Sequence, residues 1–147
     1  MKPFNRILVA TDFTDASTPA FEEALELAKK NGARLLIAHA YQPPKMSIAD
    51  AVAAGVYDEW NENLRARVTQ KLQGLVDEAT QAGVLAEPLV LVGSAEEAIV
   101  DSAKHNKADL VVMGTHGRKG VSRFFLGSVA SRVISTAPCP VMTVRAA

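Results

Sequence analysis

The chain has 147 residues, of which 48% are hydrophobic and 22% charged, a composition typical of a globular protein that can bury its own core. Its 16 basic and 16 acidic residues cancel, which argues against general nucleic-acid binding, and the single Cys139 excludes both an intrachain disulfide framework and a cysteine metal cluster. The first apolar run, Ile7 to Ala10, is too short for a signal peptide or a membrane span. We therefore expect one domain over residues 1–147 and a cytoplasmic location without membrane contact.

Apolar runs alternate with helix signals in the first half of the chain. Pro19 suits a first helical turn, Gly32 suits the position just past a helix end, and Pro43-Pro44 stops a strand because proline has no N–H donor. In chain order we predict a strand over 6–11 with Asp12 at its carboxyl end, a helix from 19 to 30, a strand over 34–41, a connection over 45–55 and a long helix over 56–82.

The alternation continues to the end of the chain. Ser94 and Glu97 have the spacing of a helix capping box, and Pro88 near the start of the third strand predicts that this strand lies at a sheet edge. The predicted elements are a strand over 87–92, a helix over 95–106, a strand over 110–113, a helix capped by Ser128 and a fifth strand over 140–145. This order predicts an α/β fold with one mostly parallel five-stranded sheet and helices on both faces.

The stretch from Asp109 to Val129 combines a buried strand, closely spaced glycines and a helix N-terminus. Gly114, Gly117 and Gly120 follow the strand directly, and Gly127 precedes the helix. Free N–H groups and the positive end of the helix dipole favour an anion at such a place. No acidic residue follows Asp109, whereas five basic ones do, which leaves residues 1–109 with eleven basic and sixteen acidic residues. The stretch predicts a phosphate site; the alternative is a solvent loop with incidental glycines.

The spacing Gly114-x-x-Gly117, nine residues, Gly127-Ser128 resembles the ATP-binding signature of the universal stress protein (UspA) family. The resemblance covers the whole chain, from Ile7-Leu-Val-Ala-Thr-Asp12 to Pro138-Cys-Pro-Val141. It implies a doubly wound, Rossmann-like sheet with strand order 3-2-1-4-5 and a nucleotide-dependent regulator of the stress response. In that order the topological reversal lies between strands 1 and 4, and ligands bind beyond the carboxyl ends of the strands at such a reversal.

The predicted ligand is ATP, or ADP or AMP. The resemblance implies that the adenine meets the backbone near Ala40 and that the ribose and α-phosphate lie at 113–117. The N–H groups of 127–129 are expected to face the β- and γ-phosphates. The candidate binding residues are Ala10, Thr11, Asp12, Ala40, Met113, Gly114, His116, Gly117, Arg118, Gly127, Ser128 and Val129.

Three of these residues have a second interpretation. Asp12 either contacts the adenine or ribose or caps the loop that follows it, and both roles can hold together. Arg118 either covers the phosphates or is an ordinary surface arginine. His116 is either a general acid or a solvated loop side chain, and a loop histidine is more often the latter.

The sequence contains no catalytic group that we can assign. It has no P-loop, no hydrolase nucleophile elbow and no evident base–nucleophile pair. No metal-ligand spacing is present, so Mg²⁺ or Mn²⁺ would be carried by the phosphates of the nucleotide. These features favour a nucleotide-binding regulator over an efficient enzyme; the alternatives are a slow ATPase and a structural stress dimer that uses no nucleotide.

The last strand is the candidate for self-association. In the order 3-2-1-4-5 it forms a sheet edge, and its residues are Val141, Met142, Thr143 and Val144. An apolar edge without internal charge or proline is a template for pairing with another chain. The resemblance likewise suggests a homodimer through this strand. The alternative is that helices or the C-terminal residues cover the edge within one chain.

Overall fold

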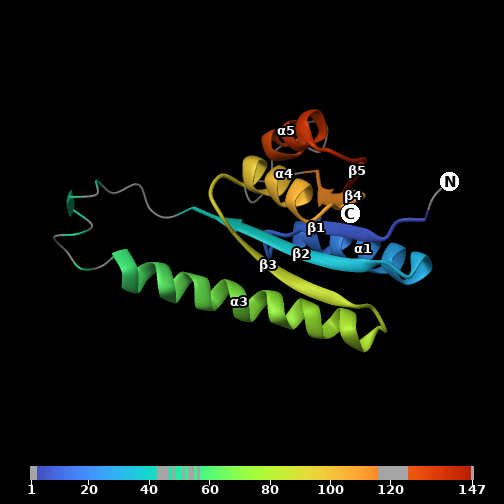
Figure 1. Cartoon of the computed structure of the whole chain (residues 1–147), viewed down its shortest axis with the longest axis horizontal. Helices are drawn as coiled ribbons and strands as arrows, with labels where there is room; N and C mark the ends of the chain where they lie inside the picture. The colour runs from blue at the N-terminus through green and yellow to red at the C-terminus, as the bar shows by residue number, and fades with distance from the viewer. Residues whose placement is uncertain are drawn as a thin grey trace.

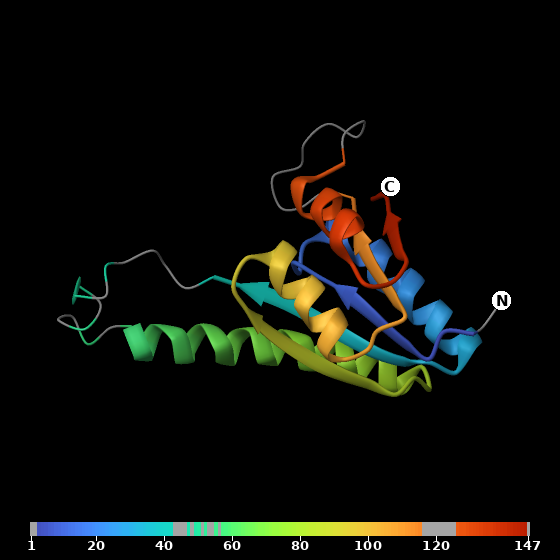
Figure 2. The same cartoon turned by 45° about the horizontal axis from the view of Figure 1, so that its top comes forward.

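The computed structural model describes residues 3–42, 47, 49, 50, 52, 55, 57–115 and 126–146. Figure 1 shows one twisted sheet with helices packed on both of its faces, and Figure 2 shows the same arrangement from a second side. Among the described residues, no helix is long and apolar enough to cross a membrane.

The sheet has five strands in the order β3-β2-β1-β4-β5, and every neighbouring pair is parallel. This confirms the predicted fold class and strand order. Parallel neighbours require a crossover between strands, which explains why a helix follows each of the first four strands. The elements are β1 (Arg6–Ala10), η1 (Asp15–Ser17), α1 (Thr18–Asn31), β2 (Arg34–Tyr41), α3 (Tyr57–Gln81), β3 (Ala86–Val92), α4 (Ala95–His105), β4 (Leu110–Gly114), α5 (Ser128–Thr136) and β5 (Val141–Val144).

The central strand β1 is buried on both faces. Ile7, Leu8 and Val9 have no exposed area. Because side chains alternate along a strand, Ile7 and Val9 pack with α1 and α3, whereas Leu8 packs with α4 and α5. This two-sided burial is why the strands of the sheet read as continuous apolar runs rather than alternating ones.

Helices α1 and α3 cover one face of the sheet, and both begin and end within about one residue of their predicted bounds. Pro19 lies in the first turn of α1, and Gly32 follows the last turn with a left-handed φ of 64°. The apolar stripe of α3 packs on the sheet through Val68, Leu72 and Val76. α3 has 25 residues, and its N-terminal part extends past the ends of β2 and β3 in Figures 1 and 2.

One helix cap agrees with the prediction and one differs from it. Ser94 occupies the N-cap of α4, although its hydroxyl oxygen is buried and has no hydrogen-bond partner among the described residues, so it makes no capping hydrogen bond. Ser128 is the first residue of α5 rather than its cap. The Gly127 N–H donates to the Thr115 carbonyl at 2.7 Å, which holds Gly127 extended and makes it the N-cap instead.

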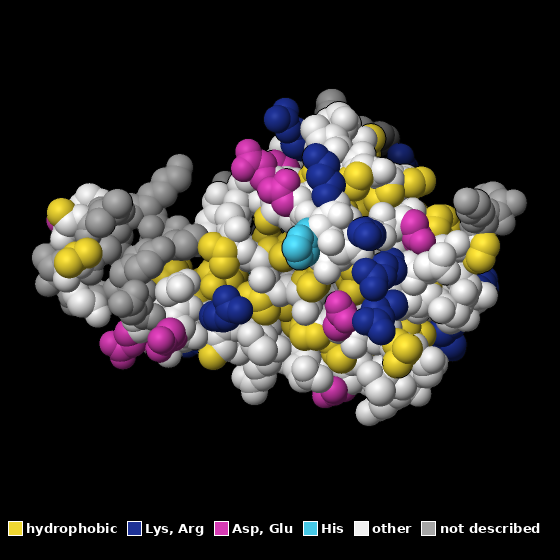
Figure 3. All heavy atoms as spheres, in the orientation of Figure 1, with side chains coloured by type: hydrophobic (Ala, Val, Ile, Leu, Met, Phe, Trp, Pro, Cys, Tyr) yellow, Lys and Arg dark blue, Asp and Glu magenta, His cyan; other side chains and the backbone are white. Residues whose placement is uncertain are grey.

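The two edges of the sheet differ in their free backbone groups. In a parallel strand, alternate residues direct their N–H and C=O to opposite sides. The Gly93 N–H donates to Tyr41 on β2, so the odd-numbered residues of β3 bond inward and Pro88 faces outward, where its missing N–H interrupts the edge. Figure 3 shows hydrophobic side chains at the surface among acidic and basic ones on the β3 side of the molecule, where Leu85 and Val92 are exposed.

The opposite edge, β5, has no such interruption. The Val144 carbonyl accepts from Thr115 and the Pro140 carbonyl accepts from Val111. The even-numbered residues therefore bond to β4, and the N–H and C=O groups of Val141 and Thr143 face outward.

A matched pair of glycine substitutions tests the backbone conformations. Gly32→Ala should lower the free energy of unfolding by about 1 kcal/mol, because an L-residue is strained at this left-handed φ although its Cβ meets no atom. Gly74→Ala, inside α3 and equally free of steric contact, should raise it by about 0.8 kcal/mol, because alanine has the higher helix propensity. Urea unfolding measures both, and two changes of the same sign would contradict the assignment.

Candidate functional site

The carboxyl ends of β1 and β4 meet at the reversal of strand order, where a ligand site is expected. The Thr11 N–H donates to Ala38 on β2 at 2.9 Å, and the Thr115 N–H donates to Val144 on β5 at 3.2 Å. The structure thus brings six predicted residues to one edge of the sheet: Ala10, Thr11, Asp12, Ala40, Met113 and Gly114. His116, Gly117 and Arg118 lie outside the described residues.

The N-terminus of α5 is held at the same edge. The hydrogen bond from the Gly127 N–H to Thr115 places the first turn of α5 beside the end of β4. This bond engages a donor that we had assigned to the phosphates. The N–H groups of Ser128 and Val129 belong to the first turn of the helix and have no acceptor within it, so they can donate to an anion.

The side chains at the end of β1 face different sides of the sheet. Ala10 packs with Met113 in the cluster formed by α4 and α5. The Thr11 side chain lies on the α1 side, where its hydroxyl is 3.0 Å from the Ser17 hydroxyl and accepts from the Phe13 N–H at 3.0 Å. The Thr11 hydroxyl therefore organises the loop between β1 and α1.

Asp12 caps the loop that follows β1, which is the structural role predicted for it. Its Oδ1 accepts hydrogen bonds from the N–H and the hydroxyl of Thr14, which fixes the turn after β1. These contacts do not test the predicted ligand role of Asp12, which stays a prediction.

His39 and Cys139 are structural rather than reactive. His39 is partly buried, its Nδ1 lies 2.7 Å from the Thr11 carbonyl oxygen, and its ring packs on Phe13 with centroids 4.4 Å apart. Burial raises the pKa of the Cys139 thiol, and the negative charge of Asp109 raises this pKa further, so the nucleophilic thiolate is disfavoured. No group of three metal-ligating side chains occurs in the part of the chain that the structure describes.

Phe13 is the residue at this edge that sequence analysis did not single out. Its backbone has a φ of 64°, the left-handed conformation that a bulky side chain rarely adopts. An aromatic residue carries no sequence signal for a positive φ, because glycine and asparagine are the usual occupants. Strain of this kind often accompanies functional sites.

Comparison with known proteins decides the family. Residues 3–145 match the sequence profile of the universal stress protein family. The chain belongs to the universal stress protein family. A universal stress protein of Thermus aquaticus is 38% identical over 143 residues, which cover 97% of this chain and 99% of that protein. A universal stress protein of Methanocaldococcus jannaschii is 34% identical over 142 residues, which cover 97% of this chain and 82% of that protein.

Solved universal stress proteins share the fold, and some contain nucleotides. UspA from Lactobacillus plantarum superposes with a TM-score of 0.75 at 29% identity, covering 96% of this chain and 97% of that one. A universal stress protein in complex with cAMP gives a TM-score of 0.70 at 28% identity and 99% coverage of both chains. The universal stress protein from Archaeoglobus fulgidus in complex with dAMP gives a TM-score of 0.65 at 25% identity, covering 97% of this chain and 99% of that one.

The loop role of Asp12 can be tested on stability. Asp12→Ala removes the acceptor of both Thr14 hydrogen bonds and should lower the free energy of unfolding by about 2 kcal/mol. Asp12→Asn keeps a carbonyl oxygen at that position and should cost less than half as much. Denaturant unfolding compares the two variants, and equal losses would show that the charge, not the acceptor, matters for the fold.

Proposed function

We propose that the protein is an adenine-nucleotide-binding regulator and that its nucleotide lies at the carboxyl ends of β1 and β4. The observation that carries the proposal is the convergence of these strand ends with the first turn of α5, fixed by the Gly127–Thr115 hydrogen bond. The complexes of family members with cAMP and dAMP support the same class of ligand.

ATP is the nucleotide that we propose, with ADP and AMP as further occupants. The N–H groups of Ser128 and Val129 and the dipole of α5 favour phosphate oxygens at this turn. The segment after Asp109 carries no acidic residue, so no carboxylate of this segment repels a triphosphate. Mg²⁺ or Mn²⁺ would arrive on the phosphates and reduce their charge.

The proposed role is regulatory rather than catalytic. The one histidine ring described at the strand ends, His39, is held by the Thr11 carbonyl and Phe13, a surrounding that suits structure more than proton transfer. Slow hydrolysis of ATP remains the second candidate. A cytoplasmic location and a single domain over residues 1–147 belong to the same proposal.

Titration of the purified protein with Mg-ATP tests the site. Gly117→Val should weaken ATP binding at least about tenfold, because a branched side chain would crowd a backbone that approaches phosphate. Gly74→Ala, in α3, is the matched control and should bind as the parent does. A folded Gly117→Val variant that binds ATP with parental affinity would contradict the site assignment. Equal ATP affinity in excess EDTA would show that binding does not depend on a divalent cation.

A hydrolysis time course on the same samples tests the regulatory role. A turnover well below about 1 s⁻¹, the low end of ordinary enzymes, is expected, and a turnover of about 1–10³ s⁻¹ would contradict that role.

We also propose a homodimer in which β5 pairs with β5 of a second copy. The outward N–H and C=O groups of Val141 and Thr143 support it, because two-fold pairing of identical strands would satisfy them. All four residues of β5 are half-buried, so their apolar side chains retain surface that a second copy could cover.

Thr143→Pro should weaken the dimer about tenfold while leaving the fold intact. The substitution removes an N–H that faces outward and leaves the bonds to β4 unbroken, and two-fold symmetry doubles the loss. Thr143→Ala keeps the N–H and is the control. Sedimentation over a concentration series measures both variants; a monomeric parent, or equal dimerisation of the proline and alanine variants, would contradict pairing through β5.

A further inference from the structure

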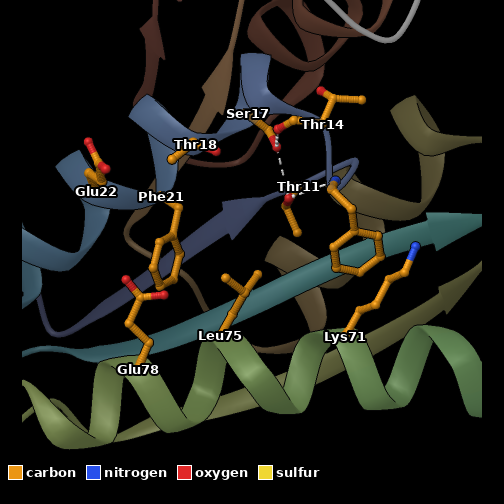
Figure 4. Close-up of a pocket in the computed structure, with 10 residues that line it drawn as sticks. Thr11, Thr14, Ser17, Thr18, Phe21, Glu22, Lys71, Leu75 and Glu78 are labelled. Carbon is orange, nitrogen blue, oxygen red and sulfur yellow. Dashed lines mark hydrogen bonds between the residues drawn. The ribbon is translucent and has the colours of Figure 1, made fainter.

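A groove of about 400 Å³ lies between α3 and the segment formed by η1 and α1 (Figure 4). Its size falls in the range of small-molecule sites. It opens on the α1 and α3 side of the sheet, the side that the Thr11 side chain faces, whereas Ala10 and Met113 lie on the other side. The groove is therefore separate from the proposed phosphate site at α5.

The floor of the groove is apolar. Phe21 is 3% exposed, and Leu75 from α3 packs partly buried against the same cluster. The hydroxyls of Thr11 and Ser17 contact each other, and Ser17 also donates to the Thr14 carbonyl. Because these hydroxyls already have partners, the middle of a ligand lying on this floor should be apolar.

The two ends of the groove carry opposite charges. Lys71, Leu75 and Glu78 lie on one face of α3, with about 10 Å of helix between Lys71 and Glu78. Figure 4 shows Glu22 and Glu78 at the Phe21 end and Lys71 at the opposite end. The ion pairs found in the described part of the chain are Lys29–Glu26 and Arg34–Glu87, so these three charges are not used in an ion pair there.

The lysine end is built around the strained Phe13. The Lys71 Nζ lies 5.3 Å from the Phe13 ring centroid, within cation–π range, and His39 packs against the same ring. These contacts hold the ring in place despite the unfavourable backbone φ of 64°. The ammonium of Lys71 therefore lies at the end of the groove, over the Phe13 ring.

We propose that this groove binds a small zwitterion whose ammonium and carboxylate are separated by an apolar body. The ligand's ammonium lies between Glu22 and Glu78 beside the Phe21 ring, its apolar body covers Leu75, and its carboxylate meets Lys71. A simple cation would leave Lys71 unpaired, and a simple carboxylate would leave both glutamates unpaired and repelling it.

Chemical-shift titration with three probes of equal chain length tests the proposal. 6-Aminohexanoate should shift the amides of Phe13 and Leu75 and bind about threefold more tightly than hexylammonium, the factor expected for one exposed ion pair. Hexanoate should bind most weakly. Absence of these shifts, or hexylammonium binding as tightly as 6-aminohexanoate, would overturn the proposal.

Charge-removing variants assign the two ends. Lys71→Met should abolish the preference for 6-aminohexanoate over hexylammonium, and Glu78→Gln should weaken both amines about threefold. Lys104→Met and Glu97→Gln remove the same charges from α4 and are the controls; equal effects there would show a general charge effect and overturn the assignment. Saturating ATP should leave binding unchanged, and displacement of the zwitterion by ATP would overturn the separation of the two sites.

Discussion

The position of every other strand depends on how β1 is buried. Ile7, Leu8 and Val9 are enclosed by strands on both edges and by helices on both faces, so the middle of β1 has no polar side chain and no solvent contact. A strand in this situation needs parallel neighbours reached by crossovers, and the crossovers supply the helices that cover it. The reversal of strand order beside β1 then opens the edge where the proposed nucleotide site lies.

The loop after β1 contributes side chains to both faces of the sheet, because the alternation of side chains continues past the end of the strand. Ala10 faces α4 and α5, whereas Thr11 faces α1 and contacts Ser17. Asp12 then fixes the turn through Thr14, and Phe13 reaches toward α3 and Lys71. Four consecutive residues thereby connect the strand ends, where we place the nucleotide, with the groove between α1 and α3.

The sequence predicted most of what depends on local pattern. Apolar runs and glycine or proline boundaries located the strands, and Pro88 correctly indicated an edge strand. Ser94 is the predicted N-cap of α4, although its hydroxyl makes no capping hydrogen bond. The cap at Ser128 was wrong, because the hydrogen bond to Thr115 holds Gly127, one residue earlier, at the N-cap of α5. The groove could not be predicted, because its lining comes from α1 and α3, which are far apart in the sequence, and the φ of Phe13 has no sequence signal.

The unequal edges of the sheet bear on how large an assembly can become. A chain with two equally receptive edges could add copies at both and grow into a continuous ribbon. Here Pro88 removes an outward donor from the middle of β3, while β5 keeps its own. In the proposed dimer the strands left at the outside would be the proline-interrupted ones, so growth through the sheet would stop at two copies. Pro88, far from β5, would then protect such an assembly against fibre formation.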